Sequence, residues 1–269
     1  MILRFYLIIS FILLSPYLFS QNIGQHGDTI LNYTDINGNK QGHWKKNYQN
    51  GNIGYEANFK NNKLVGEYKR YYEVGSIKTI IKYDKTGNKG NAVFYWDDGT
   101  KMAVGNYINQ NIKDSIWNYY ATDGALILQE NYKNGKKSGI SKKFWRNGKT
   151  SQEVPFENDI INGAYREYYE SGQKLIETLY KKGKNDGLFY RYYESNRIAI
   201  KGYYKNNVMD GKWQYFDNEG KLIQEIIYKD GKPINEKEIN EQFKNQIKEW
   251  EKNKGQFSEP NSNMFFENN

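Results

Sequence analysis

Residues 163–187 read Gly163-Ala-Tyr-Arg-Glu-Tyr-Tyr-Glu-Ser-Gly172-Gln-Lys-Leu-Ile-Glu-Thr-Leu-Tyr180-Lys-Lys-Gly-Lys-Asn-Asp-Gly187, and variants of this stretch fill most of the 269-residue chain. The opening residue recurs every 24 residues, with one step of 25, at Gly42, Gly66, Gly90, Asp114, Gly139, Gly163, Gly187 and Gly211. Eight copies at a fixed period indicate a repeat architecture, in which each unit contacts its neighbours.

Each unit is predicted to be a β-hairpin. Counting the opening residue as unit position 0, a second glycine stands at position 9 in six units, with Asn196 in the seventh and Gly124 one residue late in the fourth. Pairs such as Asn50-Gly51 and Asp98-Gly99 are typical of two-residue hairpin turns that need a positive φ. For the fourth unit, the segment 121–124 is predicted to absorb the extra residue as a three-residue turn with a bulge.

The second strand of each unit, from about position 10 to position 17, alternates apolar and polar residues, which predicts one buried and one wet face. Its last residue is aromatic in every unit: Phe59, Tyr83, Tyr107, Tyr132, Phe156, Tyr180, Tyr204 and Tyr228. With 25 Tyr, 13 Phe and 6 Trp at a mean hydropathy of −0.94, aromatic rings must supply most of the burial. We therefore expect an aromatic ladder along the buried face.

The first strand carries two further aromatic rows. A two-residue turn would place position 6 on the buried face, together with position 2; the position 6 residues are Tyr48, Tyr72, Trp96, Tyr120, Trp145, Tyr169 and Tyr193. Position 5 is an odd number of residues from positions 2 and 6, so it would not share their face in a regular strand. Either the first strand bulges, or this row lies on the outer face, and the sequence does not decide between the two. This second row is the predicted binding surface: Tyr71, Tyr95, Tyr119, Phe144, Tyr168, Tyr192 and Phe216.

The chain divides into five segments. Residues 1–20 combine Arg4, an apolar run and Ser20, as in a cleaved secretory signal peptide, and predict a secreted, periplasmic or outer-membrane-associated protein. Residues 21–37 are predicted to form an N-terminal half-repeat that caps the sheet, and residues 38–232 form the eight units. An apolar stripe in residues 233–254 predicts an amphipathic helix over the last sheet edge, and residues 255–269 form a disordered tail. The expected fold is all-β: an elongated antiparallel hairpin sheet with a C-terminal helix.

The composition argues against catalysis. The chain contains no cysteine and only two histidines, His26 and His43, which are interpreted as surface residues, and it has no phosphate-binding glycine loop. No catalytic, cofactor-binding or metal-binding residue is predicted, and the chain is not expected to be an enzyme. The net charge of +8 favours anionic partners in a general way, but the lysines are scattered through the predicted loops and are interpreted as a solvated surface.

Units such as Asn162–Gly172 and Asp210–Gly220, each followed by a closing tyrosine and a lysine-containing loop, resemble the MORN-repeat-variant family, including the YwqK-type proteins often labelled antitoxins. The resemblance covers about residues 37–232. It implies an elongated sheet of antiparallel hairpins. It also implies a role in binding proteins or membrane lipids, without catalysis.

These observations predict a non-catalytic, extracytoplasmic binding or scaffold module. An unidentified protein is the first expected partner, an anionic lipid surface or a glycan is possible, and nucleic acid is not expected. The alternative is a carbohydrate-binding repeat protein of the cell-wall or glucan type, because residues 213–220 also resemble choline- and glucan-binding repeats. A glycan site would require aromatic rings of positions 2, 5 or 6 to be exposed.

Overall fold

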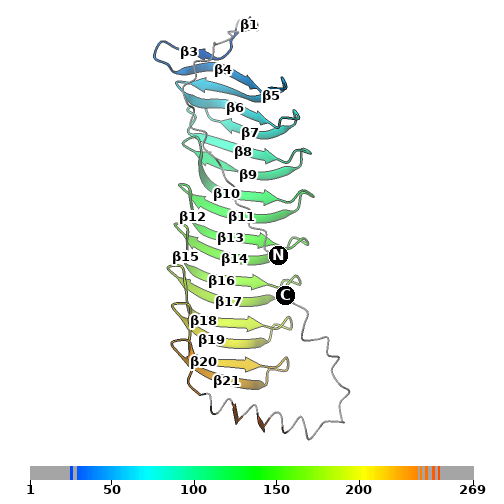
Figure 1. Cartoon of the computed structure of the whole chain (residues 1–269), viewed down its shortest axis with the longest axis vertical. Helices are drawn as coiled ribbons and strands as arrows, with labels where there is room; N and C mark the ends of the chain where they lie inside the picture. The colour runs from blue at the N-terminus through cyan, green and yellow to red at the C-terminus, as the bar shows by residue number, and fades with distance from the viewer. Residues whose placement is uncertain are drawn as a thin grey trace.

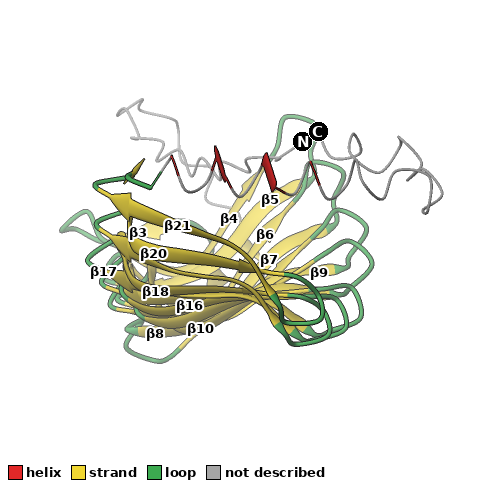
Figure 2. Cartoon of the chain, turned by 90° about the horizontal axis from the view of Figure 1, so that it is seen from below, coloured by secondary structure: helices red, strands yellow, loops and turns green. Residues whose placement is uncertain are grey.

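The computed structural model describes residues 25–26 and 29–235, and the helical positions 237, 240–241, 244–245 and 248. Its main feature is one elongated, open, antiparallel sheet that runs from β3 to β22 in chain order (Figure 1). Seen along its long axis, the strands rotate progressively from one end to the other, which is the usual twist of a sheet (Figure 2). The predicted fold class is confirmed: the described part of the chain is almost entirely β.

Sixteen long strands form eight hairpins. The first strands of the hairpins are β4 (Lys40–Asn47), β6 (Lys63–Tyr71), β8 (Lys89–Tyr95), β10 (Ile112–Tyr120), β13 (Gly139–Phe144), β16 (Gly163–Tyr168), β18 (Lys184–Tyr192) and β20 (Val208–Phe216). The second strands are β5 (Ile53–Lys60), β7 (Ile77–Tyr83), β9 (Lys101–Ile108), β11 (Leu126–Lys133), β14 (Thr150–Glu157), β17 (Lys174–Lys181), β19 (Ile198–Lys205) and β21 (Leu222–Lys229). The short strands are β1 (Gln25–His26), β2 (Thr29–Ile30), β3 (Tyr33–Thr34), β12 (Lys136–Lys137), β15 (Ile160–Ile161) and β22 (Lys232–Pro233).

The hairpin turns differ from the predicted two-residue type. In the first unit the amide of Tyr48 donates to the carbonyl of Asn52 (2.8 Å), and the amide of Gly51 donates to the carbonyl of Tyr48 (3.1 Å). Gly51 has a φ of 88°. This is a three-residue loop in which the glycine takes the left-handed conformation, and the same two bonds recur in every unit.

A second irregularity follows each turn. In all eight hairpins the register shifts by one residue between positions 4 and 5, for example between Arg70 and Tyr71. The extra residue is on the second strand, for example Lys78 between Ile77 and Thr79, so the first strand keeps its alternation and position 5 faces away from position 4. Position 6, predicted to lie on the buried face, instead begins the turn, and that part of the prediction is wrong.

The extra residue of the fourth unit does not lie in its turn, where the sequence predicts it. Its turn is like all the others, with the amide of Gly124 donating to the carbonyl of Ala121 (2.9 Å). The extra residue lies upstream, between Tyr107 and Ser115, and Ser115, with a φ of 61°, takes the left-handed place that glycine holds in most units. The unit therefore begins at Ser115 rather than Asp114, which brings Gly124 to position 9 and Tyr132 to position 17.

The buried residues lie on one side of the sheet, here called the inner face. Positions 2, 15 and 17 share this face, and the predicted ladder of closing aromatic residues is found there. Trp117 is 1% exposed and lies 4.9 Å from Tyr107, ring centre to ring centre; Trp213 lies 5.0 Å from Tyr204. Such pairs add about 0.5–1.5 kcal/mol each beyond the area that they bury. The sheet is thus held together by rings from its own hairpins.

The aromatic side chains at position 6 join successive units along the turns. The phenol of Tyr48 donates to the carbonyl of Tyr71, the position 5 residue of the next unit, over 2.7 Å. The same bond is made by the position 6 residues Tyr72, Trp145, Tyr169 and Tyr193. Among the described residues the series is interrupted on both sides of the fourth unit: the indole nitrogen of Trp96, before it, has no partner, and position 6 of the fourth unit itself is Ala121.

Both ends of the sheet are closed by an asparagine. At the N-terminal end the amide of Asn32 donates to the carbonyl of His43 (2.9 Å), and its side-chain oxygen accepts from the amide of Lys45 (2.8 Å). At the other end the side-chain oxygen of Asn235 accepts from the amide of Ile227 (2.8 Å). These bonds occupy backbone groups that would otherwise invite a further strand.

The predicted C-terminal helix lies largely outside the described residues. The positions that are described there are helical and exposed: Lys237, Asn240, Glu241, Lys244, Asn245 and Lys248. They lie past β21 at the end of the sheet (Figure 1). The predicted signal peptide (1–20) and tail (255–269) fall outside the described residues. Within the described part of the chain, no helix has the length and apolar character needed to cross a membrane.

Candidate functional site

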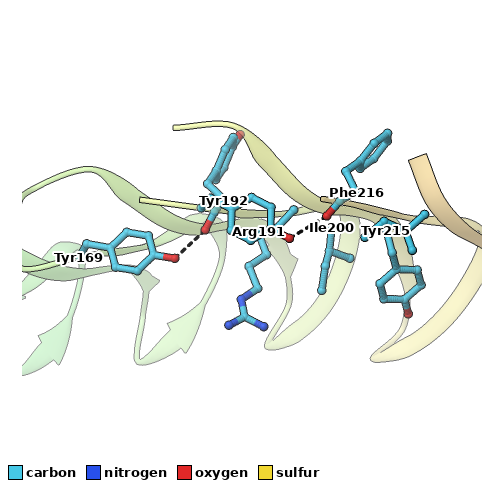
Figure 3. A pocket seen from close by; sticks show the side chains of 9 residues that line it. Tyr169, Arg191, Tyr192, Ile200, Tyr215 and Phe216 are labelled. Atoms are coloured by element: carbon cyan, nitrogen blue, oxygen red, sulfur yellow. Dashed lines mark hydrogen bonds between the residues drawn. The ribbon is translucent and has the colours of Figure 1, made fainter. Parts of the chain in front are cut away.

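The predicted binding row at position 5 lies on the face opposite the aromatic ladder, here called the outer face. The phenol of Tyr71 donates to the Glu56 carboxylate (3.0 Å) and that of Tyr168 to the Glu153 carboxylate (2.9 Å), and both acids belong to the outer-face register position 14. Figure 3 shows Tyr192 and Phe216 pointing away from the side taken by Tyr215. Of the two alternatives at position 5, the second is therefore correct: the first strand keeps its alternation, and the row lies on the outer face.

One member of the predicted row is wrong. Tyr119 pairs with Leu128 on the inner face, where its hydroxyl accepts a hydrogen bond from the ammonium of Lys113 (2.8 Å). Because the fourth unit begins at Ser115, position 5 is Tyr120, which pairs with Leu126 beyond the register shift. The corrected row is half-buried throughout: Tyr71, Tyr95, Tyr120, Phe144, Tyr168, Tyr192 and Phe216.

Charged side chains surround the row in the fifth to seventh units. Arg166 binds Glu177 (2.8 Å), and Lys142 binds Glu153 (3.0 Å). Burial, the hydrogen bond to Glu153 and its charge raise the pKa of Tyr168 to about 12. Burial alone would raise the pKa of Glu153, but the bonds from Lys142 and Tyr168 outweigh it and lower that pKa. The carboxylates are therefore held ionised and already paired, unlike a general acid that awaits a substrate.

An apolar strip runs along the outer face beside the loops that connect the hairpins. It consists of unit positions 1 and 16 in the fourth to eighth units, apart from the polar residues Asn131 and Lys212. Its residues are Ile116, Ile140, Pro155, Ala164, Leu179, Leu188, Tyr203 and Ile227. Leu188 is 52% exposed and Ile116 is 46% exposed. The same positions of the first three units are polar: His43, Asn58, Glu67, Lys82, Asn91 and Asn106.

The two long edges of the sheet differ in charge. All hairpin turns lie at one edge, here the turn edge, and all connections between hairpins at the other, here the loop edge (Figure 1). The loop edge holds seven acidic residues and fourteen lysines; the lysines are Lys60, Lys63, Lys85, Lys89, Lys113, Lys133, Lys136, Lys137, Lys181, Lys182, Lys184, Lys205, Lys229 and Lys232. All of these lysines except Lys113 and Lys137 are exposed. The turn edge holds eight acidic and four basic residues.

This edge is the functional feature that sequence reasoning missed. The lysines are scattered along the chain, but each unit reverses direction twice, so residues 24 apart return to the same edge. Grooves lie between successive connections along the loop edge. One such groove has a volume of 610 Å³ and is lined by Lys181, Lys182 and Lys184 together with Glu157 and Asp186. The 24-residue period was the signal that could have located these lysines.

The remaining described features are small pockets and isolated polar side chains. A shallow pocket of 260 Å³ lies between the turns of the sixth to eighth units, lined among others by Tyr169, Arg191 and Tyr215 (Figure 3). That volume is below the range usual for small-molecule sites. Within the described residues, no three His, Cys, Asp or Glu side chains converge to hold a metal ion. His43, predicted to be at the surface, is half-buried, with its Nδ1 3.4 Å from Asn58 Oδ1.

Comparison with known proteins agrees with the repeat geometry. The family model described as "MORN repeat variant" matches six segments of the chain: residues 40–61, 64–85, 137–158, 161–182, 185–206 and 209–230. The third and fourth units, which flank the extra residue before Ser115, are not matched. No curated protein matches the chain significantly. The narrower YwqK-type assignment stays a prediction.

Proposed function

The chain belongs to the MORN repeat variant family, and we propose that it is a non-catalytic, extracytoplasmic binding module that docks along its loop edge on an anionic membrane surface. Its outer face is then free to receive a protein. The extracytoplasmic location rests on the signal-peptide pattern of residues 1–20.

The observation that carries this proposal is the segregation of charge between the two edges. Twelve exposed lysines project from connections that lie in one line, while the turn edge is acidic on balance. A lysine close to an anionic membrane contributes about 1 kcal/mol. Contacts from only a few successive connections would therefore suffice for stable but reversible binding. The acidic turn edge would be repelled, which orients the sheet with its loop edge toward the membrane.

The docking is electrostatic, and the apolar strip of the outer face is not needed for it. The interaction should weaken with salt, because the Debye length falls from about 10 Å at 0.1 M to about 3 Å at 1 M.

The test is vesicle co-sedimentation of the chain without residues 1–20. Vesicles of phosphatidylcholine alone are compared with vesicles that also contain phosphatidylglycerol, at low and high salt. The loop-edge variant Lys133→Gln, Lys184→Gln, Lys205→Gln is expected to bind several-fold more weakly. The control Lys149→Gln, Arg197→Gln, Lys221→Gln removes three positive charges from the turn edge and should bind like the unaltered protein. Equal losses in the two variants, or no binding at low salt, would refute the proposal.

Glycan binding is the second candidate, and the half-exposed outer rings favour it. Tyr190 and Tyr192 are stacked with ring centres 6.1 Å apart, and the Lys174 ammonium lies 5.1 Å from the centre of the Tyr192 ring. Rings that keep one face open can stack on a sugar. Retention on insoluble cell-wall polysaccharide that is lost on Tyr190→Ala and Tyr192→Ala would support this candidate. Unchanged retention in those variants would remove it.

A further inference from the structure

We propose that the outer face of the fourth to eighth units is a dimer interface, on which a second copy of the chain packs sheet against sheet with its long axis reversed. The repeat itself supplies the first argument. At unit positions 1 and 16 the first three units carry polar residues, although their fold is the same. Exposed Ile116, Ile140 and Leu188 are therefore not required by the sheet. A contiguous exposed apolar patch of this kind marks an interaction surface.

The order of residues along the strip fits a copy of itself. On neighbouring strands from β13 to β19 the strip reads Ile140, Pro155, Ala164, Leu179, Leu188 and Tyr203. A two-fold axis parallel to the strands, between β16 and β17, places Ala164 opposite Leu179 of the second copy. It also places Pro155 opposite Leu188, and Ile116 opposite Ile227. In the two pairs nearest the axis a smaller residue faces a leucine, as in well-packed layers, and the contact is self-complementary, as a two-fold interface requires.

The charged row beside the strip is compatible with the same axis. Arg166 and Glu177 stand on β16 and β17 at the outer-face positions 3 and 14, so the axis brings each next to the oppositely charged residue of the second copy. The pair within one chain, at 2.8 Å, would become a network of four charges. The like charges that the axis brings together, Lys142 and Lys201, stand on the third strand to either side of the axis, and Lys142 is already paired with Glu153.

The available area is that of a stable dimer. The contact would cover the ten long strands between β10 and β21, not counting the short strands β12 and β15. These ten strands span about 48 Å at about 4.8 Å per strand. Positions 1 to 5 span about 17 Å along each strand. The contact therefore covers about 800 Å² per copy, or about 1,600 Å² in total, which is the standard size of a specific interface. In this arrangement both loop edges face the same side, so that a dimer would present two lysine edges to one membrane.

The mass of the chain without residues 1–20 tests the proposal. Sedimentation equilibrium at micromolar concentration is expected to give twice the mass of one chain. Leu188→Glu, in the middle of the strip, should reduce the species to a monomer with an unchanged circular dichroism spectrum. The matched control is Asn91→Glu, which places the same charge at the same unit position of the third unit, outside the contact, and should stay dimeric.

Cross-linking tests the reversed orientation. Because the chain has no cysteine, a single introduced thiol is unambiguous. Ala164→Cys lies beside the proposed axis, with stacked sheets about 10 Å apart, and should be joined to its own counterpart by a short bis-maleimide reagent. Asn91→Cys lies far from its counterpart and should not be. A monomeric protein, a dimer that survives Leu188→Glu, or equal cross-linking of the two cysteines would overturn the proposal.

Discussion

The phenol of Tyr169 donates a 2.8 Å hydrogen bond to the backbone carbonyl of Tyr192, 23 residues further along the chain. This bond joins the turn of the sixth unit to the end of β18, the strand that leads into the turn of the seventh unit. Because the same bond recurs at four other position 6 residues, the turn edge is held by a series of side chains in addition to the sheet hydrogen bonds. Removing one of them should loosen one junction between units and leave each hairpin intact.

Tyr169→Phe tests this junction. The substitution keeps the ring and leaves the Tyr192 carbonyl without its donor, so the free energy of unfolding should fall by about 0.5–1.5 kcal/mol. Urea unfolding followed by circular dichroism measures the change. The control is Tyr120→Phe, whose hydroxyl makes no hydrogen bond within the described part of the chain, and which should alter stability much less. A Tyr169→Phe protein as stable as the control would show that the bond contributes nothing.

Gly105→Ala tests the packing of the aromatic ladder. A β-carbon at Gly105 would overlap the indole ring of Trp117, which is 1% exposed and has no room to move. Overpacking of this kind typically costs about 1–3 kcal/mol. Gly202 meets Trp213 in the same way, so Gly202→Ala should behave alike. Near-UV circular dichroism of the tryptophans should change together with the loss of stability.

The control for these variants is Ser151→Ala, which alters a strand residue away from the indole rings. A loss of stability no larger than that of Ser151→Ala would mean that the sheet relaxes around the new methyl group. The pairing of Trp117 with Gly105, and of Trp213 with Gly202, is visible in the sequence once the units are aligned at Ser115. In both cases a tryptophan at position 2 packs over a glycine at position 15 of the unit before.

The sequence was sufficient for the period, the hairpins and the aromatic ladder, because these depend only on spacing and alternation. It was insufficient for the face of the second aromatic row. Asn50-Gly51 suits a two-residue turn and equally a three-residue loop with a left-handed glycine, and a slip of one residue moves a side chain to the opposite face. The face of Tyr168 therefore stays open in the sequence. The error at Tyr119 has another cause, because the extra residue before Ser115 makes Tyr120 the position 5 residue of the fourth unit. The loop edge was missed because charges distant in sequence meet only in the folded sheet.

Ser115→Gly tests the corrected start of the fourth unit. Ser115 has a φ of 61°, a left-handed conformation that costs a residue with a β-carbon about 1–2 kcal/mol. Glycine removes this strain but loses more backbone entropy on folding. We expect a net stabilisation of up to about 1 kcal/mol in urea unfolding. Ser151→Gly, in the interior of β14 where φ is not positive, should instead destabilise by about 0.5–1 kcal/mol. Destabilisation in both variants would place the unit boundary elsewhere.

Glu130 should make stability depend on pH. Its carboxylate is 7% exposed and accepts from Lys137 (2.5 Å) and Tyr132 (2.7 Å). Burial alone would raise the pKa of Glu130, but these bonds outweigh it and hold the pKa below its ordinary value. A carboxylate with a lowered pKa in the folded state stabilises the protein above its unfolded pKa, about 4.3, and this contribution is lost as the pH falls through the folded pKa.

Glu130→Gln should therefore destabilise the protein at pH 7, by about 1–3 kcal/mol, because Lys137 and Tyr132 lose an ionised acceptor. The difference in unfolding free energy between the unaltered protein and this variant should shrink as the pH falls below the unfolded pKa of about 4.3, because the unfolded chain then binds a proton at Glu130 before the folded protein does. Other carboxylates affect both proteins equally and cancel in the difference. Glu73→Gln, at an exposed turn, serves as the control and should give a small difference at every pH. A Glu130→Gln difference that stays constant between pH 7 and pH 3 would show that the Glu130 charge does not stabilise the fold.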